Sequence, residues 1–361
     1  MLELAKKWKE NNLNMKRTIK ILNFILPYFL VLLGVFLVLL TPLSFYSEKN
    51  LKLSFVNIDK RILSANSLEQ PIIMGGDVQA LNFPKANPII PLAKHDRDYD
   101  GKLSAVSAVV LDVKSKKVLF SKKEKQVRPL ASITKLMSVI TLLDFPVKWS
   151  ATTTIIEEDG HDDNLVEFGE TFALEDLWNL ALVGSSNKAV NALIRGAGLN
   201  IDEFVVLMNK KAQELGLDSL EFSEPTGLSD KNIGNAVDVA GLLQQALRFD
   251  KIYTSLQTGE YYAKPCGQDK VRRVWSTNWL LTNWIPNEYG SNCIVGKTGY
   301  IPESDFNFVV DLVNENQRQI ITVILGASSN EQRYIEARDL SDWIFDKYVW
   351  PGDLDYNDMV E

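Results

Sequence analysis

The sequence contains few of the residues that two common kinds of hydrolytic site require. It has only two histidines, His95 and His161, and neither H-E-x-x-H nor G-x-S-x-G occurs. We therefore do not expect a zinc metallopeptidase of the H-E-x-x-H kind or a Ser-His-Asp hydrolase of the α/β-hydrolase kind. His161 is followed by Asp162 and Asp163. One histidine and two aspartates in a polar loop are typical of solvated side chains, so no metal site is predicted.

Cysteine is equally scarce, and the charge balance excludes another class of function. Cys266 and Cys293 are too few for a disulfide scaffold. They could form one bridge in an oxidising compartment, but two free, buried thiols are the favoured interpretation. The net charge is -7, which is the wrong sign for a general nucleic-acid-binding protein. At 361 residues the chain can form one or two domains with a full core.

Charge is absent from one long segment near the N-terminus. Lysines and arginines are frequent in residues 1–20, and no charged residue then occurs between Lys20 and Glu48. Residues 21–40 are apolar on all sides and long enough to span a bilayer as a helix. The basic flank favours a cytoplasmic segment at 1–20, a signal anchor at 21–45 and an extracytoplasmic remainder of a single-pass cell-membrane protein. A cleaved signal peptide is the alternative, although no clear cleavage site follows.

The segment 46–102 reads as an extracytoplasmic linker. Prolines and a pair of glycines interrupt any regular period there, so a tether that lets the folded part stand off the membrane is expected. We predict a catalytic domain at 103–349 and an acidic tail at 350–361. No internal repeat or low-complexity tract is present.

Hydrophobic periodicity predicts both strands and helices within 103–349. A hairpin is expected at 104–121, and helices at 174–183, from 187 to about 196, at 237–248 and at 331–348. Late strands are expected at 274–280, 293–298, 306–313 and 319–325, while 152–169 reads as irregular. This order predicts an α/β (α+β) fold with an antiparallel sheet flanked by helices and a mainly helical subregion.

The segment 128–143 predicts a helix of about four turns that begins at Pro129. Ser132 would lie in its first turn, with Lys135 one turn further along the same buried face. A buried amine loses hydration, which lowers its pKa, and could then take a proton from a serine nucleophile. The helix N-terminus would favour the developing negative charge. An ordinary buried helix with a serine near its start is an equal alternative, because S-x-x-K is common by chance.

Two further short motifs follow in the sequence. Ser185 and Asn187 lie between two predicted helices, and Lys297-Thr298-Gly299 lies at a late strand. Alone, the first is typical of a capping turn and the second of a strand end, but their joint occurrence with Ser132 and Lys135 is a strong signal. Together they resemble the penicillin-binding, β-lactamase-like serine acyltransferases. Residues 128–137 narrow this resemblance to the low-molecular-mass D-alanyl-D-alanine carboxypeptidases, over roughly 103–349.

The resemblance implies a serine D,D-carboxypeptidase of β-lactamase/transpeptidase-like fold, without a cofactor, that removes terminal D-alanine from peptidoglycan stem peptides. Ser132 would form the acyl-enzyme, Lys135 would take its proton and Ser185 would relay a proton to the leaving amine. β-Lactam antibiotics would be covalent inhibitors. The implied substrate-binding residues are Asn187, Lys297, Thr298, Gly299 and Tyr300, the last through its N–H in an oxyanion hole shared with Ser132. The missing side chain of Gly299 would let substrate backbone lie against the strand.

Several positions depart from the family pattern. Lys188 stands where an aspartate is common, Asp305-Phe306 where a small residue and glycine are usual, and Ser328 where some members carry a carboxylate-binding arginine. The usual C-terminal β-rich domain and amphipathic anchor are not found, so the N-terminal anchor would replace that attachment.

Three other functions remain open. A D,D-endopeptidase that cleaves cross-links fits Arg128-Pro129 before the serine segment and the missing arginine. A β-lactamase is suggested only by Glu224, which faintly resembles the deacylating glutamate of those enzymes. A penicillin-binding sensor that has lost turnover is the non-enzymatic alternative.

Overall fold

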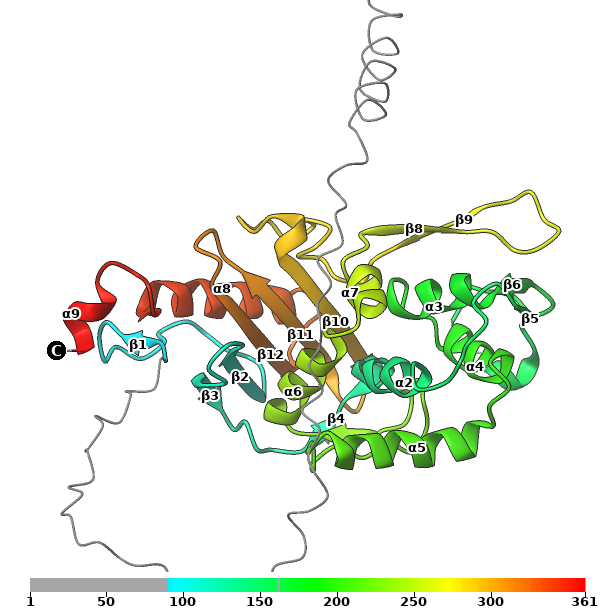
Figure 1. Ribbon diagram of the computed structural model, residues 1–361, viewed down its shortest axis with the longest axis horizontal. Coiled ribbons are helices and arrows are strands. Elements are labelled where there is room, and N and C mark those ends of the chain that lie inside the picture. Colours follow the sequence, from blue (N-terminus) through cyan, green and yellow to red (C-terminus); the bar gives the residue numbers. More distant parts are fainter. Residues whose placement is uncertain (1–89, 161–162, 361) are drawn as a thin grey trace, which may run out of the picture. The chain divides into compact units, whose positions relative to one another are not determined.

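The computed structural model describes residues 90–160 and 163–360 (Figure 1). These residues belong to one compact unit that begins at Pro84. The predicted basic segment, the predicted membrane span and most of the predicted linker lie outside the described residues. Within the described ranges, no helix combines the length and the hydrophobicity that crossing a bilayer requires.

The centre of the unit is a five-stranded antiparallel sheet with the strand order β10-β11-β12-β2-β3. Its strands are β2 (Ser107–Asp112), β3 (Val118–Lys122), β10 (Ile294–Ile301), β11 (Asp305–Val313) and β12 (Gln319–Ala327). The hairpin predicted at 104–121 and the three last predicted strands are thereby confirmed. Strands β11 and β12 are buried at most positions on both faces, which accounts for their mainly apolar sequences. Strand β10 is an edge of this sheet.

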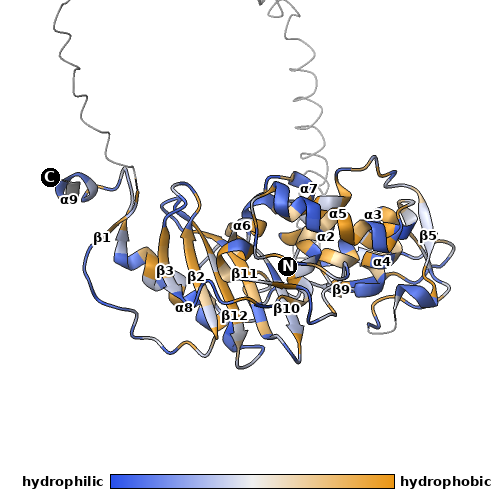
Figure 2. Ribbon diagram, turned by 90° about the horizontal axis from the view of Figure 1, so that it is seen from below, coloured by the Kyte–Doolittle hydropathy of each residue, from blue (hydrophilic) through white to orange (hydrophobic). Residues whose placement is uncertain are grey.

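Helices cover both faces of the sheet, as Figure 2 shows for α8 (Gln332–Lys347) and α6 (Ala236–Ala246). Tyr334, Leu340 and Ile344 of α8 pack against one face, where Phe308 and Val310 point. The other face carries Val309, Ile321 and Val323, which join the core around α6 and the helical subregion. The alternation of side chains along each strand therefore feeds two separate hydrophobic clusters.

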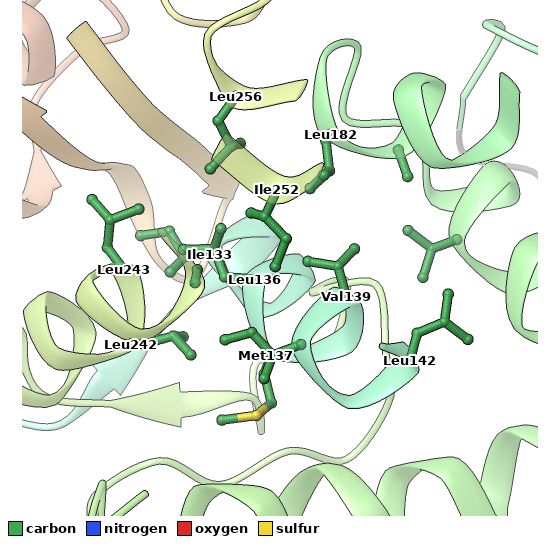
Figure 3. Close-up of a cluster of buried hydrophobic side chains, with 14 of the residues drawn as sticks. Ile133, Leu136, Met137, Val139, Leu142, Leu182, Leu242, Leu243, Ile252 and Leu256 are labelled. Carbon is green, nitrogen blue, oxygen red and sulfur yellow. The ribbon is translucent and has the colours of Figure 1, made fainter. Parts of the chain in front are cut away.

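The helical subregion lies beside the β10 end of the sheet (Figure 1). It comprises α2 (Thr134–Leu142), α3 (Leu174–Leu182), α4 (Asn187–Gly196), α5 (Ile201–Glu214) and α7 (Asp250–Leu256). Figure 3 shows Leu136 and Val139 of α2 among Leu182 and Ile252 of neighbouring helices. Three helices are capped at their N-termini. The side-chain oxygens of Ser186, Asn200 and Asn235 each accept a hydrogen bond from the N–H of the third residue of α4, α5 and α6, respectively. The predicted fold class is confirmed, although α5 was not predicted.

The described residues also form four antiparallel two-stranded sheets. These short strands contradict three predictions of secondary structure. The pairs are β1 (Leu92–Ala93) with β13 (Tyr348–Val349), β4 (Arg128–Pro129) with β7 (Ile233–Gly234), β5 (Thr152–Thr154) with β6 (Thr171–Ala173), and β8 (Glu260–Ala263) with β9 (Arg272–Trp275). The predicted strand at 274–280 is wrong, because β9 ends at Trp275 and pairs with β8 instead of the main sheet. The segment 152–169 is not wholly irregular, since it contains β5 and a 3-10 turn, η4 (Glu157–Asp159).

The helix predicted to begin at Pro129 is also wrong. Pro129 pairs with Ile233, and the N–H of Leu130 donates to the carbonyl of Asn232, so this segment is extended. Ala131 then adopts a φ of 51°, which lies in the left-handed region and is incompatible with a right-handed α-helix. A 3-10 turn, η3 (Ala131–Ile133), follows, and α2 has only nine residues. Pairing with a distant strand has overridden the local preference of proline for a helix start.

The two described ends of the chain meet at β1 and β13. Trp350 is buried and its Nε1 donates to Asp112 Oδ1 at 2.8 Å, while the hydroxyl of Tyr356 in α9 (Tyr356–Val360) donates to the carbonyl of Ile90 at 2.9 Å. Part of the predicted linker and tail thus contacts the domain. Elsewhere, Cys266 is exposed and Cys293, in the 3-10 turn η5 (Ser291–Cys293), is half-buried, and the two are not bridged. The prediction that both thiols are buried is wrong.

Candidate active site

Ser132 and Lys135 are in contact at the junction of η3 and α2. Lys135 is fully buried, and its Nζ lies 2.9 Å from Ser132 Oγ and 2.6 Å from the carbonyl oxygen of Thr226. Its third partner is Oδ1 of Asn187 at the start of α4. The carbonyl of Thr226 and the amide oxygen of Asn187 can only accept hydrogen bonds, whereas the serine hydroxyl can also donate. An uncharged Lys135 amine would therefore direct its two N–H groups at those oxygens and its lone pair at Ser132.

Strand β10 brings a second lysine to the same place. Lys297 is buried, and its Nζ donates to Ser185 Oγ at 2.8 Å and to the carbonyl of Thr298 at 3.1 Å. Burial, followed by the positive charges of Lys135 and Arg333, lowers the pKa of Lys297 well below its ordinary value. The three predicted motifs thus come together, each from a different element of the fold, with their two lysines close enough to repel each other. The chemical roles of these residues stay predictions.

Two residues beside the serines have backbone conformations that side chains rarely adopt. Ser185 has a φ of 63° and Ala131, which precedes Ser132, has a φ of 51°. Such conformations are costly for residues other than glycine and persist where the surrounding structure imposes them. Here Lys297 holds the hydroxyl of Ser185, and Ala131 is fully buried. Both strained residues therefore direct a serine hydroxyl towards a lysine amine.

Two glycines let other segments approach the backbone of Ser132. A Cβ at Gly227 would lie 2.1 Å from the carbonyl oxygen of Ala131 and 2.7 Å from the nitrogen of Ser132. A Cβ at Gly299 would lie 2.6 Å from the carbonyl oxygen of Leu130 and 3.2 Å from the nitrogen of Ser132. From the sequence, Gly299 is expected to contact substrate, and that expectation stays a prediction. The structure adds a second reason for a glycine here, which is close packing of β10 against η3.

The loop 224–227 holds the carbonyl that contacts Lys135 in place. Its role at the site was not predicted from the sequence. The carboxylate of Glu224 accepts hydrogen bonds from the N–H groups of Thr226 at 2.7 Å and Gly227 at 2.6 Å. Asn232 is fully buried, and its Nδ2 donates to Glu224 Oε1 at 2.6 Å and to Thr134 Oγ1 at 3.2 Å. Glu224 is therefore engaged by its own loop, which disfavours a role in activating a deacylating water. No local pattern identifies Asn232, because its partners lie in separate segments.

Two buried side chains were also missed, one that connects β11 to the segment before η3 and one that connects α8 to β10 and β11. Asn307 Nδ2 donates to the carbonyls of Pro129 at 3.0 Å and Leu130 at 3.2 Å. Arg333 Nη1 donates to the carbonyls of Gly299 at 3.0 Å and Asn307 at 3.3 Å. Arg333 comes from α8, beyond the last predicted motif, so only the tertiary structure connects it to the site.

Two of the departures from the family pattern have structural partners. Asp305 begins β11 with a φ of 55°, and its carboxylate lies 3.6 Å from Arg128 Nη2, just upstream of the nucleophile segment. Lys188 donates through Nζ to the carbonyl of Asp163 at 2.5 Å. Oδ2 of Asp163 accepts hydrogen bonds from the N–H groups of Asn187 at 2.8 Å and Lys188 at 2.9 Å. The carboxylate at the N-terminus of α4 thus comes from residue 163.

No group of three or more histidine, cysteine, aspartate or glutamate side chains suited to a metal ion occurs in the ranges that the structure describes. His161 and Asp162 fall in the gap between those ranges.

Solved structures identify the fold. A Streptomyces DD-transpeptidase superposes with a TM-score of 0.62 at 20% identity, covering 69% of this chain and 100% of that chain. A penicillin-binding protein from Listeria monocytogenes with cefotaxime bound gives 0.59 at 22% identity, covering 69% and 100%. The fold is therefore that of the DD-transpeptidases, with its five-stranded antiparallel sheet and flanking helices.

Sequence comparisons identify the family. The sequence model of the D-alanyl-D-alanine carboxypeptidase family matches residues 93–329, and the chain belongs to this family of serine-type D-alanyl-D-alanine carboxypeptidases. The carboxypeptidase DacF of Bacillus subtilis is 29% identical over 71% of this chain, and the match spans 66% of that relative. A D-alanyl-D-alanine endopeptidase of Haemophilus influenzae is 31% identical over 64% of this chain and 77% of its own length. That of Escherichia coli is 28% identical, over 69% and 80%.

Proposed function

We propose that this protein is a serine D,D-peptidase that acts on peptidoglycan stem peptides through an acyl-enzyme on Ser132. The observation that carries the proposal is the contact of 2.9 Å between Lys135 Nζ and Ser132 Oγ, beside the amide oxygen of Asn187 and the carbonyl of Thr226, which can only accept hydrogen bonds. Of these three neighbours, only the serine hydroxyl is able to give the amine a proton.

In the proposed reaction, Ser132 Oγ attacks the carbonyl of the penultimate D-alanine and its proton passes to Lys135. The N–H groups of Ser132 and Tyr300 stabilise the oxyanion. The amide C–N bond then breaks, and Ser185, held by Lys297, donates its proton to the leaving amine and regains one from the protonated Lys135. Water finally attacks the ester carbonyl, which releases the shortened peptide and returns a proton to Ser132.

Electrostatics favours a leaving group that carries a carboxylate. Lys297 is buried beside Lys135 and Arg333, and Thr298 Oγ1 lies 2.7 Å from Thr277 Oγ1. A carboxylate beside Lys297 would offset the repulsion between these cations and accept a hydrogen bond from the threonine. Removal of a terminal D-alanine by carboxypeptidase action is accordingly the main proposal, with β-lactams as covalent inhibitors.

Endopeptidase action on cross-links is the second candidate. The relatives that match this chain include a carboxypeptidase and endopeptidases. In addition, Ser328 stands where some family members have a carboxylate-binding arginine. The carboxylate in a cross-link belongs to a residue that continues into a second stem peptide, so the same cationic site suits both reactions.

We also propose that residues 21–45 anchor the protein in the cell membrane with its catalytic domain outside. The support is the uncharged segment that follows a basic one. Fractionation of the full chain and of a form without residues 1–45 tests this, because only the full chain should resist extraction from membranes by salt and alkali. Recovery of the full chain in the soluble fraction would overturn the anchor.

Labelling with a fluorescent penicillin tests the acyl-enzyme. The wild type and a Ser121→Ala control, altered at an exposed position of β3, should be labelled, whereas Ser132→Ala should not. Product analysis on a monomeric stem peptide and on a cross-linked dimer then separates the candidates, since release of D-alanine identifies the carboxypeptidase and release of monomer the endopeptidase. Label on Ser132→Ala would remove Ser132 as nucleophile, and labelling without turnover of either peptide would favour the sensor.

A further inference from the structure

An aromatic surface is exposed next to the proposed site. Trp275 at the end of β9 is 43% exposed and Trp284 in the following loop is 54% exposed, with ring centroids 6.1 Å apart. The guanidinium of Arg273 lies 4.3 Å from the ring centroid of Trp275. We call these three residues the tryptophan surface. Large aromatic side chains are seldom left exposed together on a protein unless they bind something.

Trp284 of this surface packs on the half-buried ring of Trp279, which in turn packs on buried aromatic rings. Trp284 contacts Trp279 with centroids 5.5 Å apart, and Trp279 stacks on Tyr334 of α8 at 5.5 Å and 17°. Tyr334 in turn packs edge-on against Phe308 of β11. The rings are therefore held before any ligand arrives, so little side-chain freedom would be lost on binding.

A short segment connects the tryptophan surface to two of the motifs of the candidate site. Thr277 follows Trp275 by two residues, and its Oγ1 lies 2.7 Å from Thr298 Oγ1. Its N–H donates to the carbonyl of Val183 at 3.1 Å, two residues before Ser185, and its carbonyl accepts from the Tyr334 hydroxyl at 2.6 Å. The segment 275–277 thus connects the exposed rings to both the Lys297-Thr298 and the Ser185 motifs.

The proposed chemistry places the leaving group on this side of the pocket. The acyl carbon bonds to Ser132, while the leaving amine receives its proton from Ser185, which Lys297 holds at 2.8 Å. A single D-alanine ends at the carboxylate beside Lys297 and Thr298. A cross-linked leaving group does not end there, because its residue continues into another stem peptide, and Thr277 adjoins the space into which that peptide would extend.

We propose that the tryptophan surface binds the second stem peptide of a cross-linked substrate, on the leaving-group side of the scissile bond. This inference rests on the proposed function and assigns the surface to its endopeptidase form. Methylene and methyl groups of the peptide would cover the two indole rings. Its free carboxylates would pair with Arg273, whose side chain is 51% exposed although Glu260 contacts its Nε.

The test compares two substrates in the same variants. For Trp284→Ala and Arg273→Gln, the ratio of kcat/KM on a cross-linked muropeptide dimer to kcat/KM on a monomer ending in D-Ala-D-Ala should fall about tenfold, mainly through KM on the dimer. Trp284→Phe should recover most of the loss. Phe249→Ala, which removes an exposed aromatic beside a different pocket, should leave the ratio as in the wild type. An unchanged ratio in Trp284→Ala, or an equal loss on both substrates, would overturn the proposal.

Two further measurements separate the possible failures. If fluorescent penicillin does not label the wild type, the proposed function fails; if it labels wild type and variants while the dimer-to-monomer ratio stays constant, only the tryptophan surface is wrongly assigned. Binding of full-length protein and variants to anionic lipid vesicles, and their elution in gel filtration, test the other occupants. A loss of vesicle binding or of self-association in Trp284→Ala with a constant ratio would assign the surface to lipid or to a second copy instead.

Discussion

The amine of Lys297 lies 2.8 Å from the hydroxyl of Ser185, across 112 positions of the sequence. This contact joins the edge strand of the sheet to the turn before α4, and it places a buried cation where a leaving amine would need a proton. We expect Lys297→Ala to lower kcat/KM on a D-Ala-D-Ala peptide by on the order of 100-fold, because Ser185 loses its partner. Steady-state kinetics measures the loss. Lys210→Ala, at a lysine whose side chain is 68% exposed, is the control, and a fall of less than about threefold in Lys297→Ala would contradict the role.

Gly299 provides a test of the close approach between β10 and η3. A Cβ there would lie 2.6 Å from the carbonyl oxygen of Leu130, so Gly299→Ala must displace the segment that carries Ser132. We expect destabilisation of about 1–3 kcal/mol and slower acylation by penicillin. Gly259→Ala is the matched control, because a Cβ there would meet nothing within 4 Å. Wild-type stability and wild-type acylation in Gly299→Ala would contradict the packing role.

Substitution of Glu224 distinguishes two roles for its carboxylate, which are holding its own loop in place and activating a deacylating water. Its carboxylate accepts bonds from Thr226 and Gly227, so Glu224→Gln should destabilise the domain by about 2 kcal/mol and slow acylation. A β-lactamase-like role predicts the opposite kinetic sign, in which the acyl-enzyme forms normally and accumulates. Time-resolved mass spectrometry of the acyl-enzyme separates the two results, and Glu221→Gln at an exposed neighbouring position controls for the change of charge.

Asp311 makes stability depend on pH. It is buried on β11, one of its carboxylate oxygens has no hydrogen-bond partner, and burial raises its pKa to about 7 despite a bond from Gln319. Between the unfolded pKa of 3.8 and about 7, the folded state binds more protons than the unfolded state. This carboxyl group therefore reduces stability as the pH rises through that window, by up to roughly 4 kcal/mol.

We expect Asp311→Asn to be more stable than the wild type at pH 8 and nearly equal to it at pH 4, because asparagine keeps an acceptor for Gln319. Urea unfolding at several pH values measures the difference. Asp230→Asn, at an exposed position, should show no such trend. A difference between Asp311→Asn and the wild type that does not change with pH would contradict the assignment.

Local sequence patterns predicted most of the regular elements. Strands β11 and β12 and helices α3 and α8 follow from their periodicity, because a pattern of apolar residues matches the face that an element buries whatever its partners are. The three motifs of the candidate site could be found for a related reason, since serine, lysine and asparagine side chains have a chemistry that is readable without coordinates. Their order and spacing indicated the family that the sequence comparison then showed.

The failures have a common cause in long-range partners. Pro129 forms a strand because Ile233 pairs with it, and Trp275 ends a strand that β8 completes. The close approach of Gly299 to the carbonyl of Leu130 was not predicted for the same reason, since Leu130 lies far away in the sequence, while the contact of Gly299 with substrate stays a prediction. Asn232, Asn307 and Arg333 support the pocket through backbone carbonyls, which every residue possesses, so no residue pattern marks the positions they contact.

By itself, the sequence determined which chemical groups this protein has available and which local elements carry them, because residue type and periodicity are properties of neighbouring positions. Only the tertiary structure decided that the amine of Lys135 lies between Ser132, Asn187 and the carbonyl of Thr226. It also decided that Thr277, two residues after the exposed Trp275, contacts Thr298. Both outcomes depend on close packing between segments far apart in the chain, where a few tenths of an ångström determine which atoms touch.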